Sequence, residues 1–258
     1  MRIYDFGEYN KVVYISSFYG KIADIKKAIE SIKDTIIICT GDLQIGRIDF
    51  EDDVERISSL QYILSDNNCN LVIIRGNHDN PKYFKRRSTF INRIKEVAPN
   101  IYLAQDYSVV HLENQNILCI GGARSINRFN LYKNIDWWQN ENVQSPADDF
   151  YEELENSNLK IDVIVSHTAP LFAKPVEFSN KLKHYNSYLV NACAMYDSEM
   201  KNDVYLERLL LKGIYEKLNN KNHIKYYVYG HYNKFFEYPY NKTNFISLAK
   251  NDLIEYVI

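Results

Sequence analysis

Short apolar runs alternate with segments of helical period through the first half of the chain. Six runs rich in β-branched and aromatic residues predict buried strands, at residues 12–15, 36–39, 71–74, 117–120, 163–165 and 226–229. Two segments between the first three runs repeat their apolar residues every three or four positions, which predicts helices with the apolar faces Ile22, Ile25, Ile29, Ile32 and Val54, Ile57, Leu60, Leu64. The N-terminal half is therefore predicted to be βαβαβ with a parallel sheet.

The second half of the chain is richer in strands. Segments at 101–105, 107–113 and 116–122 follow one another across polar breaks, which favours an antiparallel portion, and three more strands are predicted at 235–240, 245–250 and 253–258. One long helix is predicted near residues 203–218, with Leu206, Leu209, Leu210 and Ile214 as its apolar stripe. The irregular segment 170–202 is expected to lie over one face of the fold.

Length and composition are those of a globular α/β protein. The 258 residues suit one domain spanning 1–258, and two packed sheets with flanking helices would use this length. No run approaches the roughly 20 apolar residues of a membrane span. The first residues lack the apolar core of a signal peptide, so we expect a cytoplasmic protein. Four widely spaced cysteines, Cys39, Cys69, Cys119 and Cys193, are expected to be reduced and mostly buried.

The charge distribution gives little indication of a partner. A net charge of −2 provides no general attraction to nucleic acid or to a membrane. The one dense basic cluster, at residues 82–88, is open to two interpretations, a solvated helix face or a binding surface.

Polar residues follow four of the predicted strands at the point where each strand ends. Asp42 and Asn77 come after the second and third strands, and His167 and His231 come after the fifth and sixth. Because the carboxyl ends of strands in an α/β sheet share one edge, these side chains can meet around one ion. Each residue alone could be a helix cap or turn residue, but four such positions together favour a metal site. Mixed oxygen and nitrogen ligation suits Mn, Fe or Zn better than Ca or Mg.

The order of these motifs resembles a known family. GD at 41–42, GNHD at 76–79, SH at 166–167 and GH at 230–231 resemble blocks of the calcineurin-like metallophosphoesterases, which are commonly written D-x-H, G-D-x-x, G-N-H-[DE], a strand-end His and G-H-x-H. GGARSINR at 121–128, with Trp137, Trp138 and Glu141 downstream and then SHTAP, resembles a bacterial and phage branch. The resemblance runs through nearly the whole chain. It implies a four-layer αββα sandwich of two mixed β-sheets flanked by helices.

The resemblance also implies roles for particular residues. Family members usually hold two metal ions that share one carboxylate, and a bridging hydroxide attacks phosphorus. Asp42 would be the shared ligand, and Asn77, His167 and His231 would complete the second ion's site. His78 would stabilise the charge of the scissile phosphate or protonate the leaving oxygen, with Asp79 orienting its ring.

The ligands of the first ion are missing. The segment VVYISSFYG, at 12–20, aligns with the D-x-H block and supplies Ser17 and Tyr19, and the last block ends in Asn233. These neutral side chains cannot replace a carboxylate and two imidazoles, so the first site should bind a divalent ion weakly at best. Tyr19 could hydrogen-bond a substrate phosphate or fill the vacated volume.

Two arginines are candidate phosphate contacts. Arg75 and Arg124 follow predicted strands and could form forked hydrogen bonds to a phosphate. The alternative for each is an ion pair at the rim of a sheet.

Three functions remain open from the sequence. The first is a phosphomonoesterase or phosphodiesterase that uses one divalent Mn, Fe or Zn ion, which the intact His78 and Asp79 favour. The second is a pseudoenzyme that binds a phosphorylated ligand or nucleotide without turnover, and the third is a scaffold for a protein partner. The substrate or ligand could be a phosphorylated small molecule, a nucleotide or a phosphoprotein, because the fold alone does not choose among them. A membrane partner is not expected, and the net charge does not indicate nucleic acid.

Overall fold

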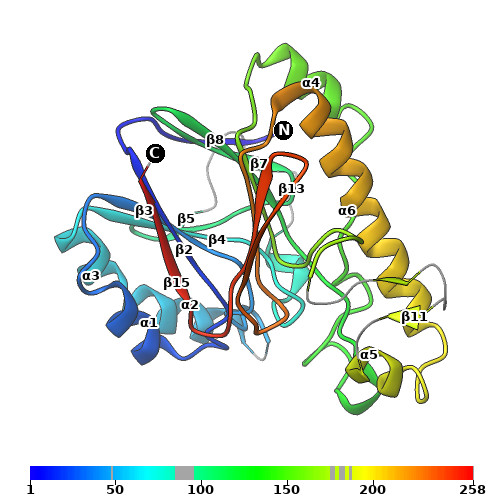
Figure 1. Ribbon diagram of the computed structural model, residues 1–258. Coiled ribbons are helices and arrows are strands. Elements are labelled where there is room, and N and C mark those ends of the chain that lie inside the picture. The colour runs from blue at the N-terminus through cyan, green and yellow to red at the C-terminus, as the bar shows by residue number, and fades with distance from the viewer. Residues whose placement is uncertain (48, 85–95, 175–177, 180–183, 186–187, 258) are drawn as a thin grey trace.

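Two mixed β-sheets pack face to face, and helices cover their outer faces (Figure 1). The computed structural model describes residues 1–47, 49–84, 96–174, 178–179, 184–185 and 188–257. The αββα sandwich that the sequence predicted is confirmed. Of the basic cluster at 82–88, only the first three residues fall within the described part of the chain.

The six-stranded sheet contains the N-terminal βαβαβ unit. Its strands, in spatial order, are β15 (Leu253–Val257), β2 (Lys11–Ile15), β3 (Thr35–Cys39), β4 (Cys69–Ile73), β6 (Ile101–Leu103) and β5 (Glu96–Ala98). The four central strands are parallel, and each edge strand is antiparallel to its neighbour. Its outer face is covered by α1 (Ile22–Ile29), α2 (Phe50–Ser58) and α3 (Gln61–Asp66). The predicted parallel βαβαβ unit is therefore confirmed.

The second predicted helix is divided into two. The helix α2 begins after Asp49, whose carboxylate accepts hydrogen bonds from the backbone N–H groups of Glu51 and Asp52, and it ends at Ser58. The helix α3 then starts at Gln61. The predicted apolar face survives the break, because Ile57 and Leu64 on either side are both buried.

The seven-stranded sheet combines the first strand of the chain with strands that follow residue 107. Its strands, in spatial order, are β1 (Ile3–Phe6), β7 (Ser108–Leu112), β8 (Gln115–Ile120), β9 (Val163–Ser166), β12 (Tyr226–Tyr229), β14 (Thr243–Ser247) and β13 (Phe236–Tyr240). The predicted antiparallel portion is present in β7 and β8. Segment 101–105 is not part of it, because β6 pairs in parallel with β4 of the other sheet. There Ile101 and Leu103 pack on the helix-covered face beside α1 to α3.

The predicted apolar stripe of the long helix is half right. In α6 (Met200–Asn222), Ile214 is buried and Leu210 packs against the core, but Leu206 and Leu209 are exposed at 52% and 38%. The buried face also contains Val204, Glu207, Arg208, Leu211, Tyr215 and Leu218. The true stripe lies about one position away from the predicted one, and the buried polar pair Glu207 and Arg208 hides it from a hydrophobicity pattern.

Shorter elements complete the described chain. They are α4 (Phe150–Asn156), α5 (Tyr188–Cys193), β10 (Phe178–Ser179), β11 (His184–Tyr185) and the 3-10 turns at Pro81–Tyr83 and Arg128–Asn130. Within segment 170–202, α5 packs against the start of α6, where Val190 and Cys193 contact Met200 and Val204. Among the described residues, no helix is both long and apolar enough to cross a membrane.

Strand alternation divides the core into layers. In β2, Val12 and Tyr14 face the other sheet, whereas Val13 and Ile15 face the helices. The inter-sheet core includes Ile38 of β3 and residues of β7, β8, β9 and β12 from the opposite sheet. The packed sheets bring the carboxyl ends of β3, β4, β9 and β12 close together. All four cysteines are buried and free, as predicted.

Candidate functional site

Four loops meet where the two sheets come together. Asp42 follows β3 and Asn77 follows β4, both in the six-stranded sheet, whereas His167 follows β9 and His231 follows β12 in the other sheet. The structure therefore brings together the four residues that the sequence singled out, two from each sheet.

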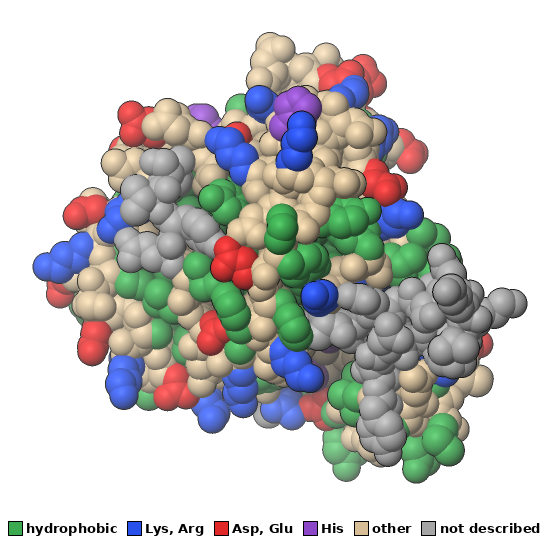
Figure 2. Space-filling model, in the orientation of Figure 1, with side chains coloured by type: hydrophobic (Ala, Val, Ile, Leu, Met, Phe, Trp, Pro, Cys, Tyr) green, Lys and Arg blue, Asp and Glu red, His purple; other side chains and the backbone are tan. Residues whose placement is uncertain are grey.

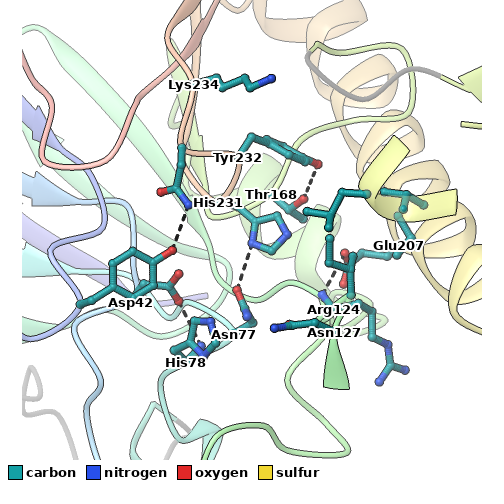
Figure 3. A pocket seen from close by; sticks show the side chains of 16 residues that line it. Asp42, Asn77, His78, Arg124, Asn127, Thr168, Glu207, His231, Tyr232 and Lys234 are labelled. Carbon is teal, nitrogen blue, oxygen red and sulfur yellow. Dashed lines mark hydrogen bonds between the residues drawn. The ribbon is translucent and has the colours of Figure 1, made fainter. Parts of the chain in front are cut away.

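The two imidazoles converge on the amide oxygen of Asn77, and the Asp42 carboxylate lies next to one of them. His231 Nδ1 lies 3.0 Å from Asn77 Oδ1 (Figure 3). His167 Nε2 lies 3.0 Å from the same oxygen and 3.4 Å from Asp42 Oδ1. The Asn77 amide nitrogen donates to Ser125 Oγ at 3.0 Å, which fixes the carbonyl oxygen toward the imidazoles. His167 Nδ1 is 2.5 Å from the carbonyl oxygen of Thr40. Since that oxygen can only accept, Nδ1 carries a proton and Nε2 is left to face the cluster.

This spacing fits one divalent ion. Donor atoms that bind a transition metal at about 2.0–2.2 Å lie about 3–3.5 Å from one another, as the atoms of this cluster do. Counting only His, Cys, Asp and Glu, however, the described residues contain no group of three or more arranged to hold a metal ion. The fit therefore depends on Asn77, whose oxygen is the shared neighbour of both imidazoles.

Burial and mutual charge set the protonation of the cluster. Burial opposes ionisation of Asp42, but the adjacent His167 holds the pKa of that carboxyl well below its usual value. Burial would lower the pKa of His167, yet the neighbouring Asp42 raises it. Burial and the charge of His167 lower the pKa of His231 to about 3. Asp42 is thus an anion that attracts positive charge to His167 Nε2, and a metal ion at this position would take the place of a proton.

Asp79 holds the two ligand loops together. Its Oδ2 accepts hydrogen bonds from the backbone N–H groups of Gly76 and Asp42, at 2.7 and 2.8 Å, and its Oδ1 accepts one from Ile45 at 2.9 Å. Asp79 was expected to orient the His78 ring, and this prediction is wrong, because both carboxylate oxygens of Asp79 accept hydrogen bonds from backbone N–H groups. The His78 ring instead places Nδ1 3.3 Å from the carbonyl oxygen of Asp136.

The two candidate arginines have different environments. Arg75 is 2% exposed and donates to Asp106 Oδ2 at 2.8 Å and to the carbonyl oxygen of Glu141 at 2.5 Å. The Arg75 guanidinium is paired with Asp106 and with backbone carbonyl oxygens, so it is not placed to bind a phosphate. The ion pair, which was the alternative interpretation of Arg75, is the one that the structure shows. Arg124 does line the cavity over the cluster, and its Nη1 donates to the carbonyl oxygen of Gln139 at 3.1 Å. Its contact with phosphate stays a prediction.

A pair of buried glutamates supports this arrangement. Glu141 accepts from the backbone N–H groups of Ser125 and Trp138, at 2.7 and 3.0 Å. The Ser125 hydroxyl oxygen in turn accepts a hydrogen bond from the Asn77 side-chain amide. Glu207 of α6 accepts from the N–H groups of Arg124 and Val143, at 3.2 and 3.1 Å. Sequence reasoning missed Glu207, and its only signal is an acidic residue inside the helical stripe.

We expect Glu141→Gln to reduce the pH dependence of stability. Burial raises the pKa of Glu141 to about 7 from an ordinary value of 4.5, so folding favours its protonated form. This contribution is fully present below pH 4.5 and is lost as the pH rises through about 7, a difference on the order of 3 kcal/mol. Urea unfolding of the variant at pH 5 and pH 8 should show a smaller decline than wild type. Glu113→Gln, in an exposed turn, is the control, and an unchanged slope in Glu141→Gln would contradict the assignment.

A cavity of about 600 Å³ opens over the cluster. Asp42, Asn77, His78 and His231 are polar lining residues. Ile126, Leu189, Val190 and Val204 are apolar lining residues, and Ile126, Val190 and Val204 belong to one apolar cluster at the start of α6. The volume is that of a small-molecule site lined by both polar and apolar groups.

The order of the ligand loops and their convergence at one cavity agree with the comparison of the sequence with family models. The model described as calcineurin-like phosphoesterase matches residues 11–234. The chain belongs to the calcineurin-like phosphoesterase family. Membership implies a metal-dependent phosphoester hydrolase, and the family normally uses divalent metals. A search of curated proteins finds no match.

Solved structures of phosphoesterases and phosphatases match this chain at low sequence identity. Phosphopantetheinyl hydrolase from Mycobacterium tuberculosis is 14% identical, with a TM-score of 0.46 over 95% of this chain and 91% of that chain. A cold-active protein-tyrosine phosphatase from Shewanella is 12% identical, with a TM-score of 0.41 over 99% of this chain and 77% of that one. A predicted phosphoesterase from Streptococcus pneumoniae is 10% identical, with a TM-score of 0.36 over 93% and 72%.

The three residues that the resemblance places at the family's first ion, Ser17, Tyr19 and Asn233, are all neutral. Tyr19 Oη accepts a hydrogen bond from Asn233 Nδ2 at 3.1 Å, so two of the three replacing residues contact each other. Ser17 is fully buried, and its hydroxyl has no hydrogen-bond partner among the described residues. None of the three carries a charge that could balance a second divalent ion.

Proposed function

We propose that this protein is a phosphoester hydrolase that works with one divalent metal ion at the second of the family's two positions. The convergence of His167 and His231 on the Asn77 oxygen, next to the Asp42 carboxylate, is the observation that carries the proposal. These residues would hold an ion of Mn, Fe or Zn in the cavity. The ion, when bound, would supply a Lewis acid for a phosphoryl oxygen and lower the pKa of a bound water.

The remaining groups have roles that follow from their positions. The His78 ring lines the cavity and lies 5.8 Å from the Tyr19 ring, measured between centroids. It can hydrogen-bond a phosphoryl oxygen or give a proton to the leaving oxygen. The apolar lining residues offer a surface for the organic part of a small phosphoester. A phosphomonoester or phosphodiester of this size is therefore the substrate class that the cavity favours.

A pseudoenzyme that binds a phosphorylated ligand is the second candidate. The replacement of all three first-site ligands favours it, because a single ion cannot clamp the attacking and leaving oxygens together. Exposed apolar side chains around α5 favour the third candidate, a protein-binding scaffold. Leu189, Met195 and Tyr196 are 57%, 84% and 74% exposed, and Figure 2 shows green side chains gathered in this region, at the lower right.

Metal content measured together with turnover tests the proposal. The protein is loaded with Mn²⁺ or Zn²⁺, freed of excess metal and assayed on an aryl phosphomonoester and an aryl phosphodiester. We expect about one ion per chain and turnover, with both lost after chelation and in His167→Ala. His111→Ala is the matched control, because His111 lies on β7 and bonds Asn116. One ion without turnover would favour the pseudoenzyme, and protein without a bound ion would refute the metal site.

A further inference from the structure

Tyr19 and Asn233 both have left-handed backbone conformations. Tyr19 has a φ of 47°, and Asn233 has a φ of 53°. The left-handed region is unfavourable for a side chain with a Cβ atom, and it is rare for a bulky aromatic residue. A hydrogen bond from the Tyr19 N–H to the carbonyl oxygen of Asp42, at 3.0 Å, holds the loop in place. Residues in sparsely populated backbone regions are often found at functional sites.

The hydroxyl group of Tyr19 has a hydrogen atom to donate. Its oxygen accepts from Asn233 Nδ2, so the O–H can point elsewhere, and no acceptor faces it in the described part of the chain. Tyr19 lines the same cavity as Asp42 and His78. The phenol is therefore a hydrogen-bond donor on the wall where the missing ion would have contacted a phosphoryl oxygen.

One lysine lies beside this donor, and a second lines the same cavity. Lys250 Nζ lies 4.9 Å from the centre of the Tyr19 ring. Lys234, the residue after Asn233, lines the cavity and is labelled in Figure 3. Within the ranges that the structure describes, no carboxylate forms an ion pair with either ammonium group. Both side chains are exposed and free to turn toward an anion.

We propose that Tyr19, Asn233, Lys234 and Lys250 form a phosphate-binding subsite where the family's first metal ion would lie. The donors of the protein, rather than a second ion, hold the phosphoryl group of the substrate against the metal at Asn77. Hydrogen-bond donors and ammonium groups are the usual partners of phosphate oxygens. The inference deepens the proposed function, since it names the groups that position the phosphoester in the same cavity.

Binding of inorganic phosphate tests the subsite independently of hydrolysis. Phosphate is titrated by calorimetry into the metal-loaded protein and into Tyr19→Phe, which removes only the hydroxyl. We expect the phosphate dissociation constant to rise about five- to tenfold in Tyr19→Phe. We expect a larger rise in the single variant Lys250→Met. The thermal unfolding midpoint of each variant should equal that of wild type. Tyr62→Phe is the control, because Tyr62 is 72% exposed on α3.

The outcomes separate this inference from the proposed hydrolase. Wild-type affinity in Tyr19→Phe would overturn the subsite and leave Tyr19 as a space-filling residue, and so would a wild-type protein that does not bind phosphate. Weakened phosphate binding in a protein without turnover would support the subsite while the hydrolase proposal fails. Where turnover is present, a KM that rises in parallel with the phosphate dissociation constant at similar kcat would support the positioning role.

Discussion

Replacing His78 by alanine is expected to lower kcat about 10²–10⁴-fold while the protein keeps its metal ion and its stability. The ring lines the cavity and makes a 3.3 Å contact with the carbonyl oxygen of Asp136. The backbone N–H of His78, which donates to Asp42 Oδ1 at 3.0 Å, is unaffected by the substitution. The substitution therefore removes the ring, which we expect to act on the substrate, and keeps the backbone N–H, which positions Asp42. Steady-state kinetics and metal analysis on the same sample measure both.

A second variant distinguishes the two roles of the ring. His78→Gln keeps a hydrogen-bonding group but cannot donate a proton as an acid. Recovery of most of the activity in this variant would indicate charge stabilisation, whereas a loss as large as in His78→Ala would indicate proton transfer to the leaving oxygen. Unchanged kcat in His78→Ala would contradict any chemical role for the ring.

The neighbouring substitution Asp79→Asn is expected to act in the opposite way, by destabilising the fold about 2–4 kcal/mol and weakening metal binding. Asp79 is fully buried, and its two oxygens accept three backbone N–H groups from the loops of Asp42 and Asn77. Asparagine keeps one acceptor and places an NH₂ group against backbone donors. Urea unfolding of the metal-free protein measures the loss of free energy.

An exposed carboxylate provides the control for this change. Asp66→Asn, at the end of α3, alters the same charge on the surface and should leave stability within about 0.5 kcal/mol of wild type. If Asp79→Asn were equally harmless and lowered only kcat, Asp79 would belong to the catalytic group and not to the loop structure.

The sequence predicted the sheets and the site because both depend on position along the chain. Alternating apolar residues place strands in two layers, and strand ends place Asp42, Asn77, His167 and His231 at one edge. The roles of Arg75 and Asp79 could not be obtained in this way. Their partners are mainly backbone atoms of other loops, and motif spacing does not give the direction of a side chain. The stripe of α6 was predicted only in part, since the polar residues Glu207 and Arg208 occupy part of its buried face.

The ligand pairs come from different sheets, so the distance between the two β-layers sets the spacing of the donor atoms. Asp42 and Asn77 follow strands of one layer, and His167 and His231 follow strands of the other. An ion bound by all four would link the two sheets. The apolar side chains that separate the layers, such as Ile38 and Val165, would then influence metal affinity, although neither is a proposed ligand. The architecture of the core and the chemistry of the site cannot vary independently.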